Sequence, residues 1–262
     1  MIKRLYFDDF DDNSYPFNIV PIKNTKELEL DNNITIFVGE NGSGKSTLLQ
    51  AIAYYNNSIN VSGASIDSHY YEAIQRLSSK MRLVYKVKTR KGFFFSGEEF
   101  ITYINSLKMM KSQLEKDLID IKEEFKEKNA YSLQLALGPI KKSLRALEDK
   151  YQGELGRKSH GEGFLEFFKA RMHQKGIYIL DEPETPLSAI NQYQLVVLIT
   201  DLVKNGSQVI LTTHSPILMA LKGAKIYNFT ENSIKEIKYE DIESVQFMKH
   251  FLNDKDNFIE RL

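Results

Sequence analysis

The sequence predicts an α/β fold with a mainly parallel central sheet, built around a phosphate-binding loop. Residues 39–46 read GENGSGKS, which fits the loop pattern GxxxxGK(S/T). The apolar, β-branched run 34–38 precedes the loop and predicts a buried strand, while 44–55 predicts a helix. Further apolar runs predict buried strands that alternate with helices: 177–180, 208–212 and 225–229. This alternation is typical of a parallel sheet covered by helices on both faces.

Length and composition limit the class of protein. The 262 residues suffice for one α/β domain, alone or with an inserted subdomain. The chain has 35 Lys plus Arg and 35 Asp plus Glu, so its net charge is zero. A zero net charge does not support DNA binding, although the surface can still carry a local basic patch. The absence of cysteine excludes disulfides, cysteine-based zinc sites and thiol chemistry.

The distribution of apolar residues predicts a cytoplasmic protein with no membrane insertion. Residues 1–9 turn acidic where a signal peptide would be apolar. The sequence has no run of about 18 apolar residues, which is the length that a membrane-spanning helix needs.

The segments around the phosphate loop supply the other elements of the N-terminal part. Two short strands are expected before the loop, at 17–22 and 26–30. The Asn-, Ser- and Gly-rich stretch 56–68 predicts a surface loop. The alternating segment 82–88 and the run GFFF at 92–95 predict two more strands.

Residues 99–151 predict a helical hairpin inserted into an α/β core that comprises 1–98 and 152–262. Apolar residues recur at steps of three or four in a charged segment: Leu107, Met110, Leu114, Leu118, Ile121 and Phe125. We expect Gly138-Pro139 to break the pattern before a second, shorter seam. The two seams either pack together or form an arm for a partner or a second copy. Helices are expected after the hairpin at 161–175, 188–204 and 240–262.

The phosphate loop is the first candidate site. Its glycines allow backbone N–H groups to turn toward phosphate oxygens, and the following helix adds the partial positive charge of its N-terminus. Lys45 is expected to reach the β- and γ-phosphates of ATP, and the Ser46 hydroxyl to bind Mg²⁺. The candidate ATP-binding residues are Gly39, Glu40, Asn41, Gly42, Ser43, Gly44, Lys45, Ser46 and Thr47.

Two acids follow the apolar run 177–180. A buried strand that ends in acids places them at the carboxyl edge of the sheet, where ligands bind in this architecture. Asp181 is suited to hold Mg²⁺, and Glu182 to orient and deprotonate the attacking water. His214 follows the next strand in a polar turn, and we interpret it as a sensor of the γ-phosphate.

Residues 158–163 read KSHGEG and precede a predicted helix. A serine and glycines at a helix N-terminus form an anion-binding site. Because one chain holds a single triphosphate, this second site requires a phosphate from elsewhere.

Together these motifs resemble the ABC-type ATPases of the P-loop NTPase superfamily. They resemble more closely the soluble AAA-family ATPases related to the SMC and recombination-repair proteins. The resemblance implies an ABC-type ATPase head that forms a head-to-tail homodimer around two ATP molecules. It implies that Ser159, Gly161 and Glu162 contact the ATP of the partner subunit. It also implies that Glu182 is the catalytic base and His214 the switch histidine.

The chain departs from the family pattern in places. No clear Q-loop glutamine follows the phosphate loop, and Glu98 is the candidate to take its place near the metal. Relatives tend to have an arginine where Ser96 stands. The aromatic residue that stacks on adenine is either Tyr15 or Phe17.

The favoured function is a Mg²⁺-dependent ATP-binding and hydrolysing switch that acts on an unknown partner protein or on DNA. The nucleotide-binding subunit of a transporter is a first alternative, although KSHGEG replaces the LSGGQ-like signature that it predicts. A module that uses ATP only to dimerise is a second alternative, and the presence of both Glu182 and His214 argues against it.

Overall fold

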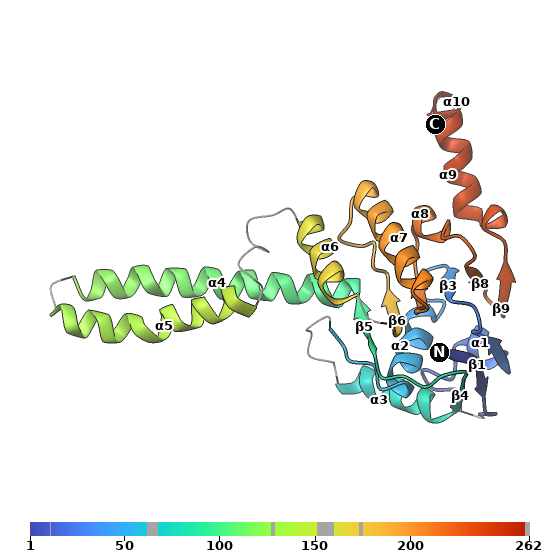
Figure 1. Ribbon diagram of the computed structural model, residues 1–262, viewed down its shortest axis with the longest axis horizontal. Coiled ribbons are helices and arrows are strands. Elements are labelled where there is room, and N and C mark those ends of the chain that lie inside the picture. Colours follow the sequence, from blue (N-terminus) through green and yellow to red (C-terminus); the bar gives the residue numbers. More distant parts are fainter. Residues whose placement is uncertain (11, 62–67, 127–128, 151–159, 173–174, 260–262) are drawn as a thin grey trace.

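The computed structural model describes residues 1–10, 12–61, 68–126, 129–150, 160–172 and 175–259. Within these residues the central sheet has six strands in the order β5-β6-β7-β3-β8-β9 (Figure 1). Only β9 runs antiparallel to its neighbour in this described sheet, so the predicted mainly parallel α/β fold is confirmed. The strands are β3 (Ile34–Gly39), β5 (Gly92–Ser96), β6 (Ile177–Asp181), β7 (Gln208–Thr212), β8 (Lys225–Phe229) and β9 (Ile234–Ile237).

A smaller antiparallel sheet lies beside the central one, in the order β2-β1-β4. It contains β1 (Ile2–Phe7), β2 (Glu27–Glu29) and β4 (Met81–Tyr85). The buried side chain of Gln208 joins the two sheets, because its amide donates to the carbonyl of Ile2 at 2.8 Å and accepts from the Ile2 N–H at 2.7 Å. Strand β1 was not predicted from the sequence, although Ile2, Leu5 and Phe7 are buried and mark its inner face.

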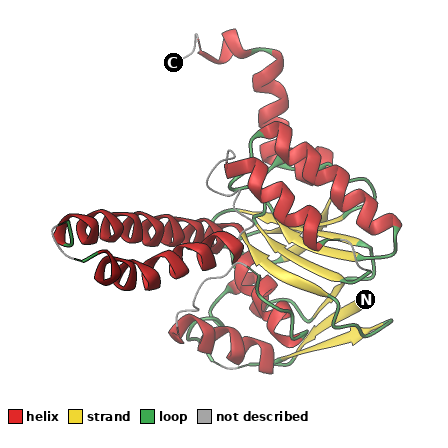
Figure 2. Cartoon of the chain, turned by 60° about the vertical axis from the view of Figure 1, so that its left-hand side comes forward, coloured by secondary structure: helices red, strands yellow, loops and turns green. Residues whose placement is uncertain are grey.

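Helices cover both faces of the central sheet, as the alternation of elements predicted (Figure 2). On one face α6 (His160–Arg171) and α7 (Ala189–Lys204) bury apolar side chains against the strands. On the other face α2 (Lys45–Tyr55), α3 (Ser68–Ser79) and the small sheet form a second apolar cluster. Each cluster collects alternate residues of the strands, since successive side chains of a strand point to opposite faces.

The segment expected as a strand at 17–22 is instead a turn followed by the start of a short helix, α1 (Val20–Lys23), so this prediction is wrong. Pro21 lies in its first turn, where the missing N–H of proline has no helical partner to lose. Ile19 and Ile22 pack against Gly44 of the phosphate loop, so α1 forms one wall of that loop.

Helices α4 (Gly97–Glu124) and α5 (Ala130–Lys150) pack along each other and project from the body (Figures 1 and 2). The prediction that Gly138-Pro139 breaks the helical pattern is wrong, because α5 continues through Pro139. A proline inside a helix costs about 3 kcal/mol, which is a local penalty. Helix α5 also packs along α4, a tertiary contact that a local sequence pattern does not include.

The C-terminal segment is helical, as predicted. It contains a 3₁₀ turn at Tyr239–Asp241, then α9 (Glu243–Asn253) and α10 (Lys255–Ile259). Helix α9 leaves the body of the molecule and ends beside α10 (Figure 1). Among the described residues, none of the helices combines the length and the apolar character that crossing a membrane requires.

Candidate nucleotide-binding site

The carboxyl ends of the parallel strands bring the candidate residues to one edge of the sheet. Asp181 at the end of β6 is the register partner of Thr212 on β7 and of Ser96 on β5. Thr212 pairs in turn with Phe37 on β3, two residues before the phosphate loop begins. This order places the loop and the acids side by side, which is where ligands bind in open parallel sheets.

The phosphate loop depends on glycine at defined positions. Gly39, Gly42 and Gly44 have φ values of 138°, 78° and 96°, a range that other residues adopt only with strain. A Cβ atom on Gly44 would lie 2.6 Å from Cγ2 of Ile19. Helix α2 begins directly after Gly44, and none of the described side chains caps it. Its first N–H groups are therefore available to an anion.

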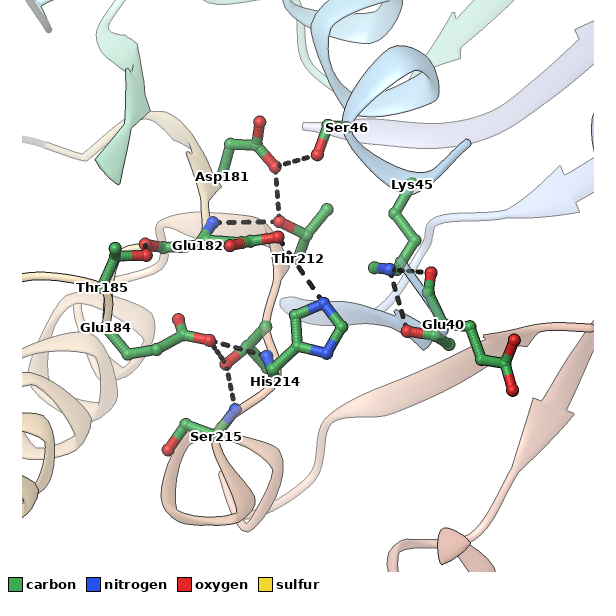
Figure 3. Close-up of polar contacts among 12 residues, drawn as sticks. Glu40, Lys45, Ser46, Asp181, Glu182, Glu184, Thr185, Thr212, His214 and Ser215 are labelled. Atoms are coloured by element: carbon green, nitrogen blue, oxygen red, sulfur yellow. Dashed lines mark hydrogen bonds and ion pairs between the residues drawn. The ribbon is translucent and has the colours of Figure 1, made fainter. Parts of the chain in front are cut away.

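Lys45 is buried at the start of α2. Its ammonium group donates to the carbonyl of Gly39 at 2.8 Å and to that of Glu40 at 2.6 Å (Figure 3). Burial lowers the pKa of Lys45, and the charges of Glu182 and Asp181 oppose this shift. The ammonium group thus lies on the loop itself, close to both acids.

Ser46 and Asp181 form the candidate metal site. The Ser46 hydroxyl donates to Oδ1 of Asp181 at 2.9 Å, and the Thr212 hydroxyl donates to the same oxygen at 2.6 Å (Figure 3). Burial raises the pKa of the Asp181 carboxyl, against the hydrogen bonds from Thr212 and Ser46. One carboxylate and one hydroxyl fit Mg²⁺, which usually keeps several waters and binds one or two carboxylates plus phosphate oxygens.

Glu182 and His214 face each other across the loops after β6 and β7. Nε2 of His214 lies 3.6 Å from Oε1 of Glu182, and both side chains are part-exposed (Figure 3). The Glu182 N–H donates to the Thr212 hydroxyl at 3.0 Å, so one threonine holds the backbone of Glu182 and the carboxylate of Asp181. Burial and the nearby Lys45 charge lower the pKa of His214, which favours the neutral ring.

A candidate cleft for a nucleotide lies next to these groups. A cleft of ≈ 720 Å³ is lined by residues 41–47 of the loop, by Glu182 and by Glu98 at the start of α4. Tyr15 also lines this cleft, and its hydroxyl lies 3.0 Å from that of Thr47. Phe17 is buried against Phe10, so of the two candidate aromatic residues only Tyr15 lines the cleft. Ser96 is buried and accepts a hydrogen bond from the Glu99 N–H as the N-cap of α4.

Two polar residues of this region, Thr212 and Glu184, were not predicted as part of the site from the sequence. Thr212 was predicted only as part of a strand, and its contact with Asp181 depends on the pairing of β6 with β7. Glu184 is buried and accepts hydrogen bonds from the Thr213 hydroxyl and the His214 N–H, both at 2.6 Å. The sequence signal that could have identified Glu184 is its place as the third acid in the run Asp-Glu-Pro-Glu.

Comparison with known families identifies the class of this site. A family described as "AAA domain" matches residues 17–158, which is more than half of the chain. The chain belongs to the AAA domain family. A second family, described as "AAA ATPase domain", matches residues 98–219 of this AAA domain. The chain is therefore an ATPase-like domain of the AAA type, with ATP binding implied by the family.

Individual relatives of this AAA domain are distant. It is 26% identical over 195 residues to "ABC transporter G family member 5" of Oryza sativa subsp. japonica, an alignment that covers 71% of this chain and 22% of the rice protein. The chain thus spans less than a quarter of that relative's length.

Solved structures similar to this AAA domain include an inward-facing putative metal-chelate type ABC transporter, with 18% identity, a TM-score of 0.46, and coverage of 97% of this chain and 90% of that one. They also include the Smc head domain of Pyrococcus furiosus bound to the C-terminal domain of ScpA, with 14% identity, a TM-score of 0.45, and coverage of 97% and 99%.

The second anion site is described only in part. Gly161 and Glu162 lie in the first turn of α6, while Ser159 lies outside the described residues. Helix α6 is fixed to the sheet through Phe164 and Phe168, which pack against Phe95 of β5. Contact of Ser159, Gly161 and Glu162 with the ATP of a partner subunit therefore stays a prediction for this AAA domain.

Proposed function

We propose that this AAA domain is a Mg²⁺-dependent ATPase that works as a switch. The observation that supports the proposal best is the convergence at the phosphate loop. Ser46 and Asp181 share a hydrogen bond at 2.9 Å, and Glu182 and His214 lie next to the same loop with 3.6 Å between their side chains. A module that uses ATP only to dimerise would not need this pair of side chains beside the phosphates.

Each side chain has a distinct role in the proposed reaction. Lys45 leaves the loop carbonyls and pairs with the β- and γ-phosphates of bound ATP. Ser46 and Asp181 would hold Mg²⁺, which would neutralise charge on the phosphate oxygens when bound. Glu182 accepts the proton of the attacking water, and the neutral His214 donates to the γ-phosphate from its Nε2.

ATP would join two copies of this domain. Ser159 and Gly161 of one subunit would contact the γ-phosphate of the ATP held by the other, and Glu162 would contact the same ATP. The proposal follows from an expected anion site at the start of α6 for which the subunit's own ATP supplies no phosphate. Closing and opening of this homodimer would act on a partner protein or on DNA. We propose that residues 99–151 form a separate subdomain for that action, inserted into a core of 1–98 and 152–262.

The rice relative, an ABC transporter by name, supports a second candidate, the nucleotide-binding subunit of a transporter. The two candidates differ in the partner that they require. Co-purification with a membrane protein from a detergent extract would favour the transporter, and co-purification with a non-membrane protein or DNA would favour the switch.

The hydrolysis step is tested by replacing Glu182 with Gln. The variant is expected to bind ATP and Mg²⁺ like the original chain and to hydrolyse at least about 10²-fold more slowly, the scale of a lost general base. Phosphate release and equilibrium binding of labelled ATP measure the two steps. Lys45→Ala is the control, since it should lose ATP binding itself. Hydrolysis at the original rate in Glu182→Gln would contradict the role of Glu182.

A further inference from the structure

Glu184 has a place in the site that the proposed chemistry does not use. It is buried three residues after the end of β6, with 9% of its surface exposed. Its Oε1 atom accepts hydrogen bonds from the Thr213 hydroxyl and the His214 backbone N–H, both at 2.6 Å (Figure 3). Bonds of this length to an ionised carboxylate are roughly twice as strong as neutral ones.

These bonds join the two turns that present Glu182 and His214. In the turn after β6, the hydroxyl and the N–H of Thr185 both donate to the Glu182 carbonyl, at 2.9 and 3.2 Å. In the turn after β7, the Ser215 N–H donates to the Thr213 hydroxyl at 3.0 Å. The Glu184 side chain connects the first turn to the second, because it accepts hydrogen bonds from both Thr213 and His214.

We propose that Glu184 is a positioning residue that holds His214 in place opposite Glu182. The inference rests on the proposed function, and it assigns Glu184 no contact with ATP. Without Glu184 the His214 backbone N–H loses its partner, and the ring is free to move from its 3.6 Å separation from Glu182. A displacement of about 1 Å at a reacting group can reduce the rate about 10²-fold.

The two oxygens of Glu184 differ, and this difference makes the proposal testable. Within the described part of the chain, Oε2 is buried without a hydrogen-bond partner, while Oε1 accepts both bonds. A glutamine can place its amide oxygen at the Oε1 position and keep both bonds. Positioning therefore survives Glu184→Gln and is lost in Glu184→Ala. Proton transfer by Glu184 would be lost in both variants.

The experiment compares kcat and KM for ATP in Glu184→Ala, Glu184→Gln and Thr213→Val. Glu184→Ala should lower kcat about 10²-fold with little change in KM, and Glu184→Gln should stay close to the original. Thr213→Val removes one of the two donors and should lower kcat less than Glu184→Ala. In a His214→Ala background, Glu184→Ala should add little, because the two residues act through one contact. Glu236→Gln on the edge strand β9 is the matched surface control.

Backbone hydrogen exchange separates this inference from the proposed function. The His214 amide should exchange faster in Glu184→Ala and at the original rate in Glu184→Gln, while the amides of β3 report whether the variants are folded. Two outcomes would overturn the positioning role. One is an equal loss of activity in Glu184→Gln and Glu184→Ala. The other is that Glu184→Ala lowers kcat as strongly in the His214→Ala background as it does in the original chain. If the original chain does not hydrolyse ATP, the proposed function fails, and exchange at His214 still decides the inference: unchanged exchange in Glu184→Ala refutes it.

Discussion

Glu182 stands in an unusual backbone conformation. Its φ of 44° is in the left-handed region, which costs a residue other than glycine about 1–3 kcal/mol. Its N–H bond to the Thr212 hydroxyl and the Thr185 bonds to its carbonyl hold this conformation. Gly97 is required beside it, since a Cβ atom there would lie 2.3 Å from the Glu182 carbonyl oxygen. The strain thus lies at the residue proposed as the catalytic base.

The charge of Glu184 predicts a dependence of stability on pH. Burial raises the pKa of this carboxyl above its ordinary 4.5, and the nearby Glu182 charge adds to this effect. Because the folded pKa is the higher one, ionisation destabilises the fold. This penalty is absent below the unfolded pKa and complete above the folded pKa. The free energy of unfolding of Glu184→Gln should therefore exceed that of the original chain at neutral pH.

Urea unfolding of both proteins between pH 4 and pH 8, without nucleotide, measures this difference. It should shrink toward the acid end, because the glutamine does not titrate and the original carboxyl is protonated there. A difference that is constant over the range would mean that the pKa of Glu184 is the same in the folded and unfolded chains.

At the scale of elements, the hairpin starts directly at the site. Helix α4 follows Ser96, the register partner of Asp181, and its first turn carries Glu98 into the cleft. The root is fixed by aromatic packing, with the Phe100 ring 5.4 Å from Phe95 and 5.3 Å from Phe164 of α6. A movement of the hairpin root would therefore be transmitted both to the cleft and to the helix of the proposed partner contact.

Shortening the hairpin tests its role. The buried residues of α4 are Gly97, Phe100 and Ile104, all at its root, so the outer turns add little to the core. Replacing 111–143 with a short Gly/Ser linker should leave ATP binding and the thermal unfolding temperature nearly unchanged and should abolish the output on the partner. Nucleotide titration and thermal unfolding measure the first part, and co-purification measures the second. A shortened chain that no longer folds would show that the two seams belong to the core.

At the scale of the whole molecule, the candidate site lies at one edge of the sheet with part-exposed Glu182 and His214 side chains. Such an edge is accessible to a second copy, as the proposed ATP-bound homodimer requires. Helix α9 and the hairpin project from the body, away from the small sheet (Figure 1).

Sedimentation tests the dimer. The Glu182→Gln protein should be a dimer with ATP and Mg²⁺, because slow hydrolysis preserves the closed state, and less associated without nucleotide. Adding Ser159→Arg should block the dimer by placing a large side chain at the proposed γ-phosphate contact, and should leave ATP binding to the subunit's own loop intact. A Glu182→Gln protein that stays monomeric at saturating ATP would refute the ATP-bound dimer.

The sequence alone determined the parts of the protein whose physics is local. The loop at Gly39–Ser46 depends on glycine φ values and on the apolar strand before it, so both could be predicted from adjacent residues. The parallel strands of the central sheet, and the place of Asp181 and Glu182 at a strand end, followed from the apolar runs of the sequence.

Only the tertiary structure decided features that depend on contacts between distant residues. Helix α5 continues through Pro139 and packs along α4, and Phe17 is excluded from the cleft because it is buried against Phe10. The bond between Glu184 and Thr213 joins residues 29 positions apart, and the pairing of β6 with β7 brings them together. Burial and hydrogen bonding of this kind are properties of the assembled core, which no local pattern specifies.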